Sequence, residues 1–147
     1  MQCHLTVDDV IHYVKYNDEI LTIFGNISVV SSIKSITFES YNDDPGNLEI
    51  KGQDKWPSGY PDCESGGLLL HCRANDTMSP WHNFKSDNSS DWLDEFNSTP
   101  CKSSKGMLNA ASYFAYFFKN LNVKKIWADR KTVTLIASPK PGNASSL

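Results

Sequence analysis

The sequence predicts an α+β fold that is mainly antiparallel β, as a small barrel or a sandwich, with one long helix in the C-terminal half packed on it. Two observations support this prediction. Short runs of β-branched and aromatic residues separated by turn formers fill the first half, and one apolar stripe at helical spacing follows at residues 104–121. This order of elements also allows an OB-like barrel.

The first half of the chain reads as β-hairpins. Residues 6–16 are rich in β-branched and aromatic types, Asn17-Asp18 is a turn signal, and residues 20–24 form a second predicted strand. Further strands are expected at residues 27–30, 33–39, 48–50 and 67–73.

A long polar loop and a helix are predicted next. Residues 75–101 are polar with embedded aromatics, and a loop of that length is unusual unless it is functional or closed by a crosslink. Ser103 or Ser104 can cap the helix at 104–121, whose apolar stripe should be core. We therefore expect Phe118 to be buried.

The chain is expected to end in a hairpin and a polar tail. Strands at residues 123–127 and 132–137 flank Asp129-Arg130. The pattern predicts a single domain over residues 1–138 and a flexible tail over residues 139–147.

The cysteines predict two disulfides and an oxidising compartment. Cys3, Cys63, Cys72 and Cys101 form no CxxC pair, and no histidine has zinc-ligand spacing, so neither a metal nor another cofactor is expected. The protein should be secreted or periplasmic with its signal peptide removed, although a cysteine at position 3 also permits a lipoprotein. Three pairings are open. We favour Cys72–Cys101 with Cys3–Cys63, because the first closes the long loop.

Charge and hydropathy exclude two partner classes. The net charge of −3 gives no footprint for nucleic acid, and no apolar run approaches the roughly 20 residues of a membrane span. Asn-x-Ser/Thr sequons permit either glycosylation or compositional coincidence. They begin at Asn26, Asn75, Asn88, Asn97 and Asn143.

Aromatic residues in polar loops suggest a ligand-binding face at residues 54–62 and 75–100. An aromatic face can stack on a sugar ring while neighbouring amides and imidazoles bond its hydroxyls, or the same rings can fold inward and pin their loops. Trp81 is the preferred residue, because Pro80 restrains the backbone before it. The candidate ligand-binding residues are Trp56, Tyr60, Trp81, His82, Asn83 and Trp92.

No catalytic residue is assigned. Loop carboxylates such as Asp94 and Glu95 could support glycosidic chemistry, but nothing in the sequence raises their pKa, and a solvated loop is favoured. We expect a non-enzymatic recognition domain that binds a glycan or another protein. The alternatives are an inhibitor or immunity-type protein that blocks a partner enzyme, and a small secreted hydrolase.

The segment CKSSKGMLNAASYFAYFFKNLNVKKIWAD at residues 101–129 resembles the helix-to-strand segment of the B subunits of AB5-type toxins. The resemblance covers about a fifth of the chain. It implies a homo-oligomeric, glycan-binding OB fold. The loop at 75–101 departs from that pattern, and no carbohydrate-contact residue can be carried over.

Overall fold

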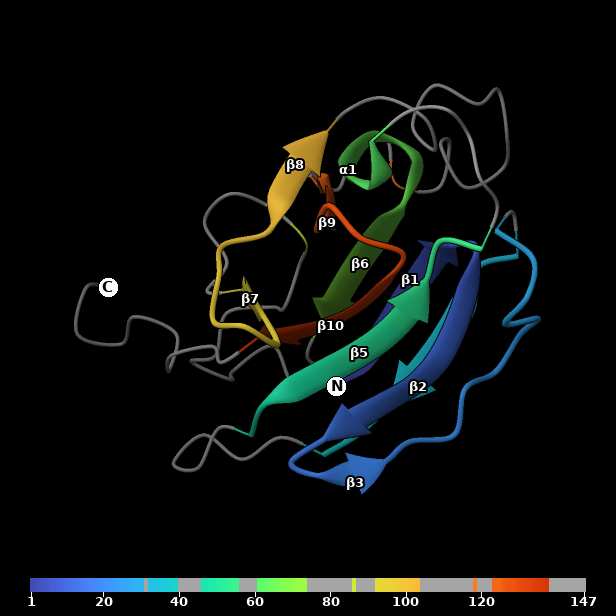
Figure 1. Cartoon of the computed structure of the whole chain (residues 1–147). Helices are drawn as coiled ribbons and strands as arrows, with labels where there is room; N and C mark the ends of the chain where they lie inside the picture. Colours follow the sequence, from blue (N-terminus) through green and yellow to red (C-terminus); the bar gives the residue numbers. More distant parts are fainter. Residues whose placement is uncertain are drawn as a thin grey trace.

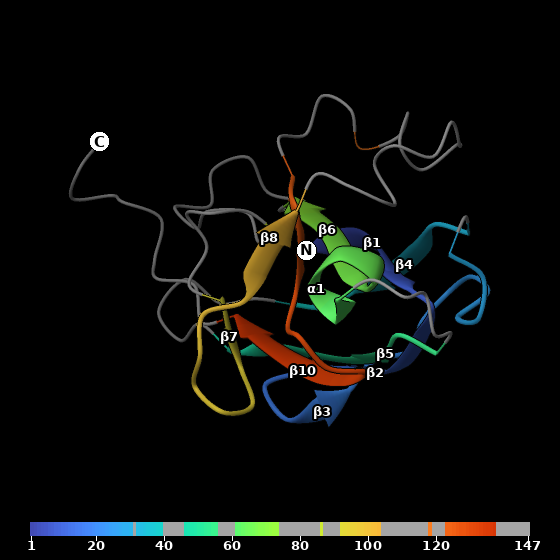
Figure 2. The same ribbon diagram turned by 45° about the horizontal axis from the view of Figure 1, so that its top comes forward.

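Two five-stranded antiparallel sheets pack face to face in the computed structural model (Figure 1). It describes residues 1–30, 32–39, 46–55, 61–73, 86, 92–103, 118 and 123–137. The first sheet has the order β4-β1-β6-β9-β8 and the second β3-β2-β5-β10-β7, and Figure 2 shows them as two layers. The elements are β1 (Gln2–Asp8), β2 (Val10–Tyr16), β3 (Glu19–Ile20), β4 (Lys34–Thr37), β5 (Leu48–Gln53), α1 (Asp62–Ser65), β6 (Gly67–Arg73), β7 (Trp92–Asp94), β8 (Cys101–Ser103), β9 (Lys125–Trp127) and β10 (Thr132–Ala137).

The chain changes sheets between β1 and β2. One strand was predicted at residues 6–16, but it is divided at Asp9, so β1 lies in the first sheet and β2 in the second. The predicted turn is confirmed: Asn17 and Asp18 have φ values of 52° and 65°, and the turn joins β2 to β3. Positive φ at both central positions matches the twist of a tight hairpin.

The core lies between the sheets and draws on both. Alternate residues of β5 and β10 are buried, as expected for strands with one covered face, whereas in β1 Thr6 is buried as well as Leu5 and Val7. Trp127 of β9 is the largest fully buried side chain. Gly66 permits its close packing, because a Cβ there would lie 2.4 Å from the indole Nε1.

The expectation of one long helix packed on the sheet is corrected. In the part of the chain that the structure describes, α1 is the only helix with assigned bounds, and it has four residues. Residues 104–121 lie outside the described part except for Phe118, which is helical and buried against Leu69 and Val123 on the first sheet. No described helix is long and apolar enough to cross a membrane.

The predicted C-terminal hairpin is also wrong. Strands occur at both places, but β9 pairs with β6 and β8 in the first sheet, whereas β10 pairs with β5 and β7 in the second. The Asp129–Arg130 link therefore carries the chain from one layer to the other. The predicted tail at 139–147 lies outside the described residues.

Two disulfides are confirmed, but their pairing differs from the favoured one. Cys3 and Cys72 are bonded across β1 and β6, where the antiparallel register places them opposite each other. Cys63 and Cys101 join α1 to β8. The second disulfide lies beside the site described below, and two disulfides are typical of proteins outside the cytosol.

Candidate functional site

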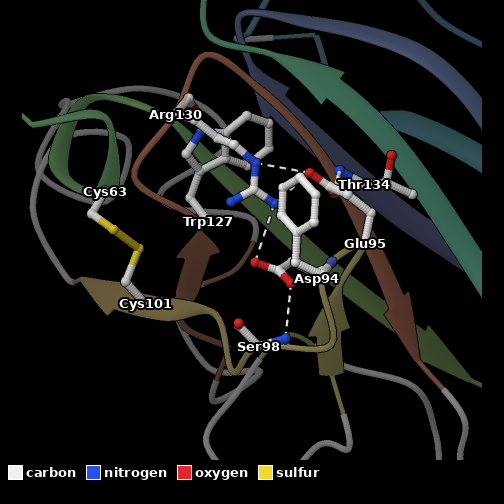
Figure 3. A network of polar contacts seen from close by, with 9 residues as sticks. Cys63, Asp94, Glu95, Ser98, Cys101, Trp127, Arg130 and Thr134 are labelled. Atoms are coloured by element: carbon white, nitrogen blue, oxygen red, sulfur yellow. Dashed lines mark hydrogen bonds and ion pairs between the residues drawn. A yellow bond between two sulfur atoms is a disulfide. The ribbon is translucent and has the colours of Figure 1, made fainter.

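Arg130 is the centre of a polar network beside the turn that follows β7 (Figure 3). Its Nη2 lies 3.1 Å from Oδ2 of Asp94, and its Nε donates to Oε1 of Glu95 at 2.8 Å. The Arg130 carbonyl accepts a hydrogen bond from Nε1 of the buried Trp127 at 3.1 Å. Arg130 is therefore held at its backbone carbonyl by Trp127 of the core and at its guanidinium by two carboxylates.

Asp94 organises the turn itself. Its Oδ1 accepts hydrogen bonds from the backbone N–H groups of Phe96 and Ser98, both at 2.9 Å. Asn97 takes the left-handed conformation, with φ of 65°, which asparagine tolerates better than most residues. Burial alone would raise the pKa of Asp94, but the bonds from Ser98, Arg130 and Phe96 outweigh it and lower that pKa. Asp94 thus acts as an ionised cap that fixes the turn.

Phe96 is displayed at the tip of this turn. Its side chain is 71% exposed, and the guanidinium carbon of Arg130 lies 4.7 Å from its ring centroid. A cation over a ring face is attracted by the ring quadrupole, so Arg130 holds one face of Phe96. The result is a large exposed aromatic ring on a restrained backbone.

The network continues along the outer face of the second sheet. Glu95 Oε2 accepts the backbone N–H of Thr134 at 2.6 Å, and Thr134 comes one position before Leu135, the first residue of β10 that pairs with β7. The Thr134 side chain shares a hydrogen bond with Tyr13, whose hydroxyl donates to Glu49 at 2.6 Å. Burial and the Glu49 contact raise the pKa of Tyr13 to about 12. We call this group the Phe96 site; it comprises Tyr13, Glu49, Glu95, Phe96, Arg130 and Thr134.

The charges around the Phe96 site balance. Lys51 of β5 lies between Tyr13 of β2 and Thr134 of β10 in the register of the sheet. Glu49 of β5 lies opposite Lys15 of β2. Lys15 lies over the Tyr13 ring, with Nζ 4.7 Å from the centroid. Among the described residues, the register and the Arg130 network place three cations and two carboxylates on this face, with the buried carboxylate of Asp94 beneath Arg130: Lys15, Lys51, Arg130, Glu49 and Glu95.

A second polar cluster lies where β1 ends and beside α1. Burial raises the pKa of Asp8 to about 8, assisted by a hydrogen bond with Asp9 and the charges of Asp9 and Asp54. Burial also raises the pKa of Asp54 to about 6, although Ser65 donates to Asp54 at 2.7 Å and opposes this rise. Lys131 lies 3.7 Å from the Asp54 carboxylate and 2.8 Å from that of Asp62.

The carboxylates of this cluster lie within interaction distance of one another. Contacts with Asp9 help to raise the pKa of Asp8, and contacts with Asp9 and Asp62 help to raise that of Asp54. Such contacts tie the β1–β2 junction, the end of β5 and α1 together, and they make the junction sensitive to pH. Within the described ranges, no group of three His, Cys, Asp or Glu is placed to hold a metal ion.

The structure places only one of the predicted ligand-binding residues. Trp92 is 3% exposed and belongs to the core between the sheets, so its ring cannot stack on a ligand. Its β7 neighbour Leu93 faces outward instead. The other five lie outside the described residues; they are Trp56, Tyr60, Trp81, His82 and Asn83.

The sequence did not predict the Phe96 site, although Glu95 was considered as a loop carboxylate. Phe96 lies within the predicted binding loop, and the order Glu95-Phe96-Asn97 places an aromatic between polar groups, which is a signal that could have found it. Arg130 and Tyr13 gave no local signal, because strand pairing alone brings them to this face.

Comparison with known protein families, with curated proteins and with solved structures found no match. The segment that resembles toxin B subunits lies largely outside the described residues. Any inference about function therefore depends on the geometry of the site.

Proposed function

We propose that this protein is an exported, non-enzymatic recognition domain that binds a neutral glycan at the Phe96 site. The observation that supports this most strongly is the ring of Phe96, which is mostly exposed while Arg130 holds it in place. A large exposed apolar side chain that the fold restrains is typical of a binding surface. Two disulfides favour secretion or a periplasmic location.

The chemistry around Phe96 suits a sugar. The apolar face of a pyranose can stack on the ring, and the carboxylate of Glu95 and the guanidinium of Arg130 can bond its hydroxyls. Because the turn and Arg130 already fix the ring, stacking costs little side-chain entropy. Tyr13 and Glu49 extend the polar surface along the sheet, which allows room for more than one sugar unit.

The balance of charges favours a neutral ligand. The three cations of the face are offset by two carboxylates beside them and by the buried Asp94 that pairs with Arg130, so a sulfated or sialylated glycan would gain no net attraction. A nucleic acid or a strongly acidic peptide is disfavoured for the same reason.

A glycan array tests the proposal directly. We expect the wild-type protein to bind a subset of neutral glycans, and Phe96→Ala to lose that binding while its melting temperature stays within about 2 °C, as for most surface substitutions. Phe24→Ala is the matched control, because Phe24 is also exposed but forms a bridge with Ser35 of β4, in the first sheet. It should bind like the wild type.

Two results would contradict the proposal. One is that the wild type binds no glycan on the array, which would favour the inhibitor or immunity-type alternative. The other is that Phe96→Ala binds the same glycans as strongly as the wild type, which would place the glycan site elsewhere.

A further inference from the structure

A second exposed apolar surface lies in the loop that precedes β4. Phe24 is 59% exposed, and Ile27 and Val29 are about two-fifths exposed, at 39% and 40%. Residues 20–33 contain no charged side chain. Several exposed apolar side chains in one uncharged loop form a surface that a partner or a bulky group can cover.

The fold holds this loop in its outward conformation. Ile11 N donates to the Ile27 carbonyl at 3.1 Å, and the buried Lys34 Nζ donates to the Val29 carbonyl. Thr6 Oγ1 donates to the Val30 carbonyl at 2.6 Å. Because each anchor binds backbone, it fixes the chain and leaves the side chains of Ile27 and Val29 exposed.

The same loop contains the sequon Asn26-Ile27-Ser28. Asn26 is exposed, and its Oδ1 accepts the backbone N–H of Ser28 at 3.1 Å, which makes a local Asx turn. Its own backbone N–H donates to Ser32 Oγ at 3.2 Å. A glycan on Asn26 is therefore compatible with the folded chain, and Phe24 precedes the acceptor by two residues.

We propose that Asn26 is an acceptor for an N-linked glycan whose first sugars cover Phe24, Ile27 and Val29. A glycan is bulky and solubilising, and the apolar face of its first sugar can lie on the Phe24 ring. Export into an oxidising compartment, which the two disulfides favour, is where such transfer takes place. This inference does not depend on the Phe96 site.

The transfer step needs a lipid-pyrophosphate-linked oligosaccharide as donor and the transferase of the exporting cell. The side-chain Nδ2 of Asn26 bonds to the anomeric carbon of the first sugar. The bond between that carbon and the pyrophosphate oxygen breaks, the lipid pyrophosphate leaves, and Nδ2 loses one proton. No electron is gained or lost by either partner.

The test uses the full chain, secreted from a eukaryotic cell line. Intact mass and peptide mapping before and after peptide-N-glycosidase treatment locate each glycan, because release converts the acceptor Asn to Asp. We expect the peptide that contains Asn26 to carry a glycan. Ser28→Ala should lose the entire N-linked glycan on Asn26. Ser32→Ala, in the same loop but outside the sequon, should keep that glycan.

A second readout tests the cover itself. Enzymatic release of the glycan should raise the fluorescence of anilinonaphthalene sulfonate, a dye that binds exposed apolar surface, and Phe24→Ala should reduce that rise. An unmodified Asn26 in the secreted protein would overturn the inference, whether or not another sequon is occupied. So would a glycan on Asn26 whose release leaves the dye fluorescence unchanged.

Discussion

Asp8→Asn tests whether burial and the neighbouring carboxylates raise the pKa of Asp8 in the folded chain. The ordinary pKa of Asp8 is 3.8, and burial raises it to about 8 in the folded chain. Between these values the unfolded chain has lost this proton and the folded chain retains it, so stability falls as pH rises from about 4 to 8. Asn cannot ionise, and it can still donate a hydrogen bond to Asp9, so the substitution should remove this contribution.

The magnitude follows from the size of the pKa change. Moving the pKa from 3.8 to about 8 sets an upper limit of about 6 kcal/mol, at roughly 1.4 kcal/mol per pH unit. Asp8 is only half-buried and is coupled to Asp9 and Asp54, so solvent screening and proton sharing reduce this limit considerably. We therefore compare the free energy of unfolding of Asp8→Asn with that of the wild type at each pH. The difference, variant minus wild type, should be larger at pH 8 than at pH 5 by about 2 kcal/mol, which corresponds to about 4–8 °C in melting temperature.

Thermal unfolding of both proteins at pH 5 and pH 8 measures this difference. His4, whose pKa burial and Arg73 lower, also titrates in this range and contributes equally to both proteins. Asp54 is coupled to Asp8, so any change in its titration is part of the measured difference. Asp18→Asn is the matched control, because Asp18 is exposed in the β2–β3 turn and the charge change is the same. The reasoning is refuted if the offset of Asp8→Asn from the wild type changes with pH no more than the offset of Asp18→Asn does.

Three further substitutions test the packing that supports the sites. Trp92→Ala should lower the free energy of unfolding by about 3–5 kcal/mol in urea titration, and an unchanged value would contradict its place in the core. Gly66→Ala would place a Cβ 2.4 Å from Nε1 of Trp127 and should cost about 1–3 kcal/mol by calorimetry; a neutral effect would show that the contact is not tight. The double change Cys63→Ser with Cys101→Ser should cost about 4 kcal/mol in the chain-entropy model, and a loss below about 1 kcal/mol would oppose it.

Local patterns predicted some strands and missed others: residues 27–30 form a turn and not the expected strand, the strand expected at 20–24 is reduced to β3 and a bridge at Phe24, and β7 and the start of β8 lie in the segment predicted as a loop. The apolar run at 67–73 coincides with β6, and the Asn17-Asp18 turn joins two strands as expected. Both signals are short in range, because side-chain periodicity and turn conformation depend on neighbouring residues. Burial of Phe118 also followed from the periodicity of its segment.

Local patterns could not predict which strands pair or which side chains face the core. Strands β9 and β10 are neighbours in sequence but lie in different sheets, since each finds its partners among strands far away in the chain. Trp92 and Phe96 are aromatics of one polar segment, yet Trp92 is opposite Ala137 in the ladder and faces the core, while Phe96 lies beyond the strand. Arg130 joins this turn across 36 positions of the sequence.

Locating the residues that a bound glycan contacts tests the assignment of the Phe96 site most directly. Two-dimensional amide NMR of the isotopically labelled protein, titrated with a neutral oligosaccharide that scores on the array, reports every backbone position in one experiment. We predict that the amides of residues 94–98 and 132–136 shift most. Shifts confined to the first sheet, with those amides unchanged, would contradict the assignment of the Phe96 site.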